Sequence, residues 1–158
     1  MPSSPAGYSL QTRFKRFIHP KDVLTGGFEI FALKAHHKRL TLRFAIPDGL
    51  PPLLTDPVTF VHVFHLLVDR AIDVTPTGGV TVRARRTAGG VVIAVEDEGP
   101  SVAPMDVPKL FLETSPDADL RLATRLTRRI DGALTATSGG RQQGLCVTLL
   151  VPVVPALS

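Results

Sequence analysis

Hydrophobic and polar positions change their spacing along the chain, and each change predicts a different element. Residues 22–37 have their apolar members, Val23, Ile30, Phe31 and Leu33, in a pattern that favours a helix. Residues 40–46 then alternate apolar and polar side chains, which is the period of a strand. The turn residues Pro47-Asp48-Gly49 and the pair Pro51-Pro52 end this strand.

A long helix is predicted after Asp56, which is an N-cap residue followed by Pro57 at the first helical position. Its core face has the 3.6-residue period of an amphipathic helix and consists of Phe60, Phe64, Leu67 and Ala71. The helix stops before Pro76, and Gly78-Gly79 turns the chain into a strand containing Val80, Val82 and Ala84. Gly89-Gly90 predicts a hairpin between this strand and residues 91–95.

The second half of the chain predicts a loop, a helix and a closing hairpin. Residues 99–116 are loop-like, with at most a short helical turn near residues 107–111. Residues 118–130 form an amphipathic helix with Leu122, Leu126 and Ile130 inward and Arg121, Arg125, Arg128 and Arg129 outward. The basic face is either a solvated surface or a partner surface. Residues 134–137 and 145–151 form a hairpin around Gly139-Gly140.

These elements predict one α/β domain, a two-layer sandwich in which helices cover one face of a mixed sheet. The expected domain spans residues 20–152, with a lead-in at residues 1–19 and a tail at residues 153–158. A chain of 158 residues is long enough for one domain with its own core.

Composition and charge narrow the function classes. The net charge is +4, but the basic residues are scattered and there is no Trp and one Tyr, so nucleic-acid binding is not expected. No apolar run has the length of a membrane span, so no direct membrane contact is expected. The single cysteine, Cys146, suits a reducing cytoplasm and is interpreted as a small hydrophobe in a strand.

The order of motifs resembles the ATP-binding catalytic domain of bacterial sensor histidine kinases. Residues 34–82 contain a strand, a Pro-rich turn, an Asp-capped helix and a Gly-Gly turn in the order of that family. The segment VVIAVEDEGPSVAP resembles the G1 box, VPKLF the F box, and DADLRLATRLTRRIDGALTATS the G2 helix with its following strand. The similarity covers about residues 20–152 and implies the histidine-kinase ATPase (Bergerat) fold, also seen in gyrase, Hsp90 and MutL. In that family ATP lies between helices under a mobile lid, and phosphoryl transfer depends on positioning and magnesium.

The N box of the family presents two asparagines toward the phosphates and magnesium. The matching positions are interpreted as His65 and Asp69, and Asp73 continues the same polar stripe, which begins at His62. By this resemblance Asp69 is the candidate magnesium ligand, since hard cations accept carboxylate oxygen. Two alternatives remain: a transition-metal site of His62, His65 and Asp69, or a solvated or cleft-facing side of the helix.

In the G1 box, Asp97 matches the family's adenine-binding aspartate and Gly99 its first glycine, while Ser101 replaces the second glycine. The alternative is a strand that ends in an Asp-Glu-Gly-Pro turn without a ligand. The lid, Met105 to Pro116, is short, lacks glycine and has Lys109 as its nearest basic residue.

The G2 box departs furthest from the family. Its Gly-rich start of the helix reads here as Ser115-Pro116-Asp117-Ala118-Asp119, so Asp117 or Asp119 would cap the helix where phosphate normally binds. At an effective dielectric constant of about 20, each like-charge contact at about 5 Å opposes the triphosphate by about 3 kcal/mol.

The resemblance therefore predicts a histidine-kinase-like domain of a two-component phosphorelay with degraded N, G1 and G2 boxes, in effect a pseudokinase. ATP and Mg²⁺ are the implied cofactors, with weak or absent binding, and the expected role is regulatory or docking. The implied partners are a histidine-containing dimerisation domain, a response-regulator receiver domain or a second copy in a homodimer. Three alternatives stay open: a working ATP-binding domain that donates phosphoryl to a separate histidine, an anti-sigma-type regulator of the same superfamily, and a structural domain without ligand.

Overall fold

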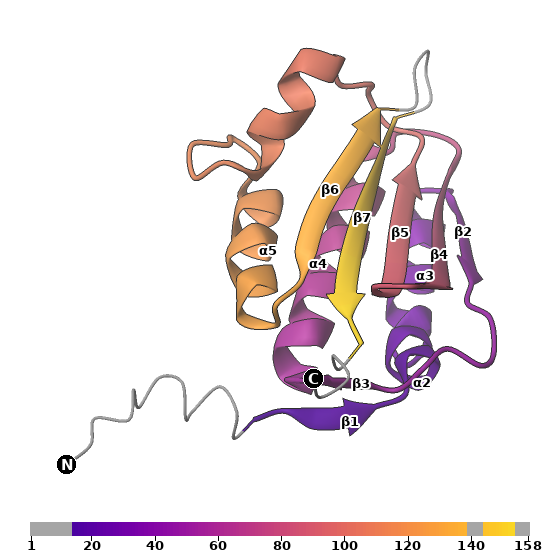
Figure 1. Cartoon of the computed structure of the whole chain (residues 1–158). Helices are drawn as coiled ribbons and strands as arrows, with labels where there is room; N and C mark the ends of the chain where they lie inside the picture. Colours follow the sequence, from indigo (N-terminus) through magenta and orange to yellow (C-terminus); the bar gives the residue numbers. More distant parts are fainter. Residues whose placement is uncertain (1–13, 139–143, 154–158) are drawn as a thin grey trace.

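The computed structural model describes residues 14–138 and 144–153. Five of its strands are β2 Thr41–Ala45, β4 Gly79–Thr87, β5 Gly90–Asp97, β6 Ala133–Ser138 and β7 Leu145–Pro152. They form one sheet in the order β2-β4-β5-β7-β6, in which β2 and β4 are parallel and the other neighbours antiparallel (Figure 1). Helices lie behind one face of this sheet, so the predicted two-layer α/β sandwich is confirmed.

The core lies between the sheet and the helices because the strands bury alternate residues. Val80, Val82 and Ala84 of β4 are at most 7% exposed, and β5 and β7 bury every second residue in the same way. The intervening residues are more exposed, and Figure 1 shows the described helices on one face of this sheet. No helix of the described residues is long and apolar enough to cross a membrane.

Helix α4, Pro57–Val74, is the central helix and begins where the sequence predicts. The carboxylate of Asp56 accepts a hydrogen bond from the backbone N–H of Val58 (3.0 Å), which satisfies a free donor of the first turn. The predicted core face, Phe60, Phe64, Leu67 and Ala71, is buried. Helix α5, Ala118–Arg129, packs against α4.

The predicted helix over residues 22–37 is wrong as a single element, because two glycines divide it. The structure has α2, Pro20–Thr25, and α3, Phe28–His37, with Gly26 as the C-cap of the first and Gly27 as the N-cap of the second. A Cβ on Gly27 would lie 3.0 Å from Nε2 of His65, so the close approach of α3 to α4 leaves little room for a side chain there. Helix α3 buries Phe31 and Ala35, whereas Ile30 and Leu33 are exposed.

A second, two-stranded sheet pairs β1, Arg16–Ile18, with β3, Leu53–Thr55, in antiparallel register. The described fold therefore begins within the segment that the sequence assigned to a lead-in, because Ile18 is buried beside Leu53. Residues 1–13 and 154–158, which make up most of the predicted lead-in and tail, lie outside the described residues.

The second half of the chain has the predicted order of elements, but the buried face of helix α5 differs from the predicted one. The short 3₁₀ helix η1, Pro104–Phe111, extends the predicted turn near residues 107–111. In α5, Leu122 is 38% exposed, while Leu120 and Ala123 join Leu126 and Ile130 in the core. The predicted inward position of Leu122 is therefore wrong. The turn residues Gly139-Gly140 lie outside the described residues.

Candidate functional site

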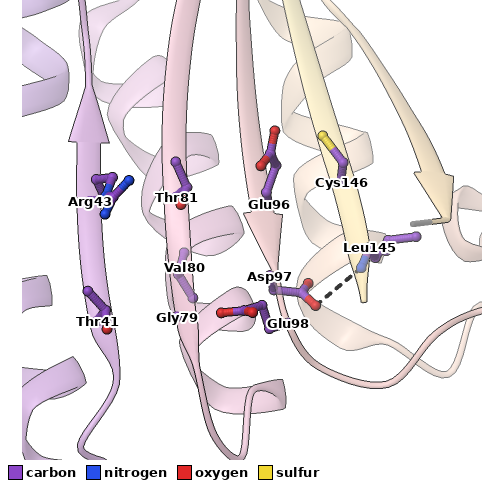
Figure 2. Close-up of a pocket in the computed structure, with 10 residues that line it drawn as sticks. All are labelled: Thr41, Arg43, Gly79, Val80, Thr81, Glu96, Asp97, Glu98, Leu145 and Cys146. Atoms are coloured by element: carbon purple, nitrogen blue, oxygen red, sulfur yellow. Dashed lines mark hydrogen bonds between the residues drawn. The ribbon is translucent and has the colours of Figure 1, made fainter. Parts of the chain in front are cut away.

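Strand β5 ends at Asp97, whose side chain turns toward the helices because it continues the buried register of the strand. The residue is 3% exposed, and its Oδ1 accepts hydrogen bonds from the backbone N–H groups of Gly99 (2.9 Å) and Leu145 (3.2 Å). Figure 2 shows the bond to Leu145. Burial raises the pKa of Asp97 above its ordinary value, although these bonds and the charge of Arg70 oppose the rise. Asp97 thus ties the end of β5 to the start of β7.

The two other residues of the G1 prediction lie in different environments. Gly99 is buried against the end of α4, and a Cβ there would lie 2.7 Å from the carbonyl oxygen of Val74. Ser101 is exposed in the loop between β5 and η1. The structure therefore brings Asp97 and Gly99 together and places Ser101 further along the loop.

The residue of α4 that reaches Asp97 is Arg70. Its side chain is 10% exposed, and its Nη1 lies 3.3 Å from Oδ2 of Asp97. The Nε of the same guanidinium donates to Oδ2 of Asp117 over 2.7 Å. The sequence alone does not give the direction of this side chain, but the spacing of Arg70 carries a signal. It follows Val63 by seven residues and Leu67 by three, and both of these are buried.

Asp117 caps α5 as the sequence predicts. Its Oδ1 accepts from the backbone N–H of Leu120 (2.9 Å), while its own N–H donates to Oγ of the buried Ser115 (3.2 Å). Arg121 donates from Nη1 to the carbonyl oxygen of Ser115. The first turn of α5 is therefore held by this chain's own groups, in the place where a helix N-terminus can hold an anion.

Asp119, two residues into α5, lies in an unfavourable field for a carboxylate. Burial raises its pKa first, and the negative charges of Asp117, Asp73 and Asp69 raise it further, while Lys34 opposes them. The start of α5 and the outer side of α4 thus bring the four predicted carboxylates close enough to interact.

Lys34 of α3 balances part of this charge. Its Nζ lies 3.1 Å from Oδ1 of Asp69 and 2.9 Å from Oδ1 of Asp73. Burial alone would lower the pKa of Lys34, but the two carboxylates raise it above its ordinary value. The Asp69 and Asp73 side chains therefore form an ion-paired group with α3.

His65 does not share the surroundings of Asp69 and Asp73, with which the sequence pattern placed it in one polar stripe. Its ring packs edge-on against Phe31 (centroids 4.8 Å apart) and lies 6.4 Å from the ring of Phe64. His62 is exposed on the outer side of the helix. His65 therefore takes part in the packing between α3 and α4.

A metal site finds no support in the arrangement of these side chains. Across residues 14–138 and 144–153, no three His, Cys, Asp or Glu side chains are grouped so that they could hold a metal ion. This argues against the alternative of a transition-metal site at His62, His65 and Asp69. The same finding does not test Asp69 as a Mg²⁺ ligand, because Mg²⁺ is usually held by one or two carboxylates together with substrate phosphates.

A pocket of about 630 Å³ lies on the face of the sheet opposite the helices. Thr41, Arg43, Thr81 and Glu96 project into it, and Figure 2 shows them on the same side of three neighbouring strands. Cys146 also lines it, and burial raises the pKa of this thiol, which disfavours the reactive thiolate. The pocket shares Asp97 and Leu145 with the group of residues around Arg70.

Comparison with known proteins gives one family model, several sequence relatives and several solved structures that are similar to this chain. A family model described as histidine kinase-, DNA gyrase B- and HSP90-like ATPase matches residues 55–155. The adaptive-response sensory kinase SasA of Synechocystis sp. is 36% identical over 76 residues, which cover 47% of this chain and 20% of SasA. The chain thus spans about a fifth of the length of this curated relative.

Solved structures of two histidine kinases share the fold. Full-length ShkA in complex with AMPPNP gives a TM-score of 0.76 at 24% identity and covers 90% of this chain and 32% of ShkA. Histidine kinase ThkA in complex with the response regulator protein TrrA gives a TM-score of 0.78 at 16% identity, covering 89% of this chain and 42% of that one. Because the family model matches more than half of its residues, the chain belongs to the histidine kinase-, DNA gyrase B- and HSP90-like ATPases.

Proposed function

We propose that this chain is the histidine-kinase-like ATPase domain of a two-component phosphorelay that binds ATP weakly or not at all. Its N, G1 and G2 boxes are degraded, and it acts as a regulatory or docking module, in effect a pseudokinase. One observation carries this proposal: the end of the site where the family resemblance places the phosphates is acidic.

Carboxylates from two helices create this acidity. Asp69 and Asp73 come from α4, Asp117 and Asp119 from α5, and the first three raise the pKa of Asp119 by their charge. Two nearby cations are already paired with these carboxylates: Lys34 with Asp69 and Asp73, and Arg70 with Asp117. At an effective dielectric constant of about 20, one like-charge contact at about 5 Å opposes a phosphate by about 3 kcal/mol. Even half of that weakens binding about tenfold.

The proposed partners follow from the relatives. Histidine kinase ThkA has been solved with a response regulator protein, TrrA, and this chain shares its fold. We therefore propose a receiver domain or a histidine-containing dimerisation domain as the partner. A dimerisation domain would bring two copies of this chain together as a homodimer. By analogy with sensor kinases we place the domain in the cytoplasm.

Calorimetry and thermal melting with Mg²⁺-ATP and Mg²⁺-ADP test the proposal. A ligand at a hundred times its Kd stabilises a protein by about 2.7 kcal/mol, which for a domain of this size raises the Tm by roughly 5–10 °C. We expect no binding heat and no such rise at millimolar nucleotide. A dissociation constant in the low micromolar range would contradict the proposal and favour the working ATP-binding domain.

A matched pair of variants tests the role of the acidic end. Asp119→Asn removes one carboxylate while Asp48→Asn removes one that lies far along the chain, in the turn after β2, paired with Lys21. If the acidic end limits binding, only the first variant gains affinity for ATP, by up to about tenfold. Equal affinities in both variants would mean that charge at α5 is not the cause.

A further inference from the structure

Arg70 contacts two carboxylates, and in each of them one oxygen accepts hydrogen bonds from the backbone while the other faces the guanidinium. In Asp97, Oδ1 accepts from the backbone N–H groups of Gly99 and Leu145, and Oδ2 faces Arg70. In Asp117, Oδ1 accepts from the backbone N–H of Leu120, and Oδ2 faces Arg70. The Oδ2 atoms of Asp97 and Asp117 therefore form one acceptor site. The guanidinium of Arg70 occupies this site.

We propose that Arg70 is an intramolecular ligand that determines specificity: its guanidinium occupies the acceptor atoms of Asp97 and so excludes adenine from them. The inference rests on the proposed function, because it concerns the adenine end of the same site. Arg70 also pairs with Asp117 of the acidic phosphate end, so the test uses a ligand without phosphate to separate the two ends.

The charge and burial of the group make this exclusion strong. Arg70 is 8% exposed as a residue and Asp97 is 3% exposed, so each is the counter-charge of the other in a poorly solvated place. An adenine amine is a neutral donor, and its bond to Asp97 would leave the buried guanidinium with one carboxylate in place of two. Guanidinium matches carboxylate geometry closely and is always charged, so a neutral amine competes poorly with it.

The position of Arg70 explains why the loss of adenine contact need not loosen the fold. The guanidinium links the C-terminal half of α4 to the end of β5 and to the start of α5, which are the elements that carry the N, G1 and G2 boxes of the family resemblance. In this chain, those three elements are held together by a side chain of α4.

Adenosine is the probe that separates the two ends of the site, since it has the adenine ring and no phosphate. We expect wild-type protein to show no adenosine binding at millimolar concentration. Arg70→Ala should bind adenosine at least about tenfold more tightly, the equivalent of one hydrogen bond to a charged acceptor. Amide chemical shifts of Gly99 and Leu145, which donate to Asp97, should move on titration.

Methylguanidinium, which replaces the missing side-chain group, provides a second readout. Competition between it and adenosine for the variant is not expected if Arg70 has a purely structural role. Methylguanidinium should raise the Tm of Arg70→Ala, leave the wild type unchanged and compete with adenosine for the variant. The matched control is Arg125→Ala, which removes an exposed arginine paired with Glu113 and should leave adenosine binding as in the wild type.

The outcomes separate this inference from the proposed function. A folded Arg70→Ala protein that binds adenosine no better than wild type overturns the inference and leaves the proposed function standing. If the variant binds ATP as tightly as adenosine, the inference stands and the acidic-end account fails. If Arg70→Ala does not fold, Arg70→Gln undergoes the same titration, and adenosine binding to the wild type with shifts at Gly99 and Leu145 overturns the inference in any case.

Discussion

The guanidinium of Arg70 donates from Nε to Oδ2 of Asp117 over 2.7 Å and so connects the C-terminal half of α4 to the N-cap of α5. The other oxygen of Asp117 accepts from the backbone N–H of Leu120, 2.9 Å away. One carboxylate therefore starts a helix and fixes that helix to its neighbour. The contact with Arg70 uses the charge of this side chain and the cap uses its oxygen, and a glycine, which the family resemblance would place here, has neither.

Replacing Asp117 with Ala should lower the free energy of unfolding by about 2–4 kcal/mol, because the change removes a helix cap and one partner of a buried arginine. The midpoint of urea unfolding measures the effect. Asp119→Ala is the matched control, because Asp119 lies in the same turn and has a raised pKa, which indicates that its surroundings oppose its charge. Equal destabilisation by the two variants would show that the contact with Arg70 contributes nothing.

Asp97 should matter for the fold even without any ligand. Its carboxylate holds two backbone N–H groups and one guanidinium, so Asp97→Ala should cost about 3–5 kcal/mol, as expected when one partner of a buried ion pair is removed. Asp97→Asn keeps an oxygen acceptor for Gly99 and Leu145 and should cost less than the alanine variant. If both variants melt at the wild-type temperature in the absence of nucleotide, the side chain is held for a ligand and not for the structure.

Gly144 should tolerate no side chain, because it lies directly against Asp97. Its φ is 64°, and a Cβ there would clash with the backbone oxygen and the Oδ1 of Asp97. Gly144→Ala should therefore destabilise the domain by about 2–5 kcal/mol, the sum of left-handed strain and overpacking. Gly49→Ala is the control: its φ is 81°, but no atom lies within 4 Å of an added Cβ, so the strain of about 1–2 kcal/mol acts alone. Thermal melting of the two variants separates the terms, and equal losses would contradict the clash.

Local signals in the sequence were sufficient for the elements that begin and end at recognisable residues. Asp56 and Pro57 set the start of α4, and Gly89-Gly90 set the hairpin between β4 and β5. The break in the first predicted helix was missed, because glycines are tolerated within a helical pattern. The close approach of Gly27 to His65 is a contact between α3 and α4, which no local pattern contains.

The charged site needed information that no local pattern contains. Arg70 meets Asp97 across 27 positions of sequence and Asp117 across 47, so its partners follow from the packing of α4, β5 and α5. Asp97 and Gly99 were predicted as adenine-end residues from their motif, and the structure brings these two residues together. Whether they bind nucleotide stays a prediction.

Removing the charge of Asp119 should stabilise the domain at neutral pH and have no effect in acid. Burial and the charges of Asp117, Asp73 and Asp69 raise the pKa of Asp119 above 3.8, its ordinary value, in the folded state. The folded protein then binds the proton more tightly than the unfolded chain, so wild-type stability falls as pH rises through the window above 3.8.

Asp119→Asn removes this loss, and we expect a gain in the free energy of unfolding of up to about 1 kcal/mol at pH 7. The gain should shrink as the pH falls toward 3.8 and vanish below it, in urea titrations of both proteins across that range.

The control has the opposite sign. Arg125 lowers the pKa of Glu113 below 4.5, its ordinary value, so the stability that Glu113 contributes is present above that pH and is lost in acid. Glu113→Gln should therefore be less stable than wild type at neutral pH and equal to it in acid. A loss of stability in Asp119→Asn at pH 7 would mean that the attraction of this carboxylate to the N-terminus of α5 exceeds its repulsion by the other three.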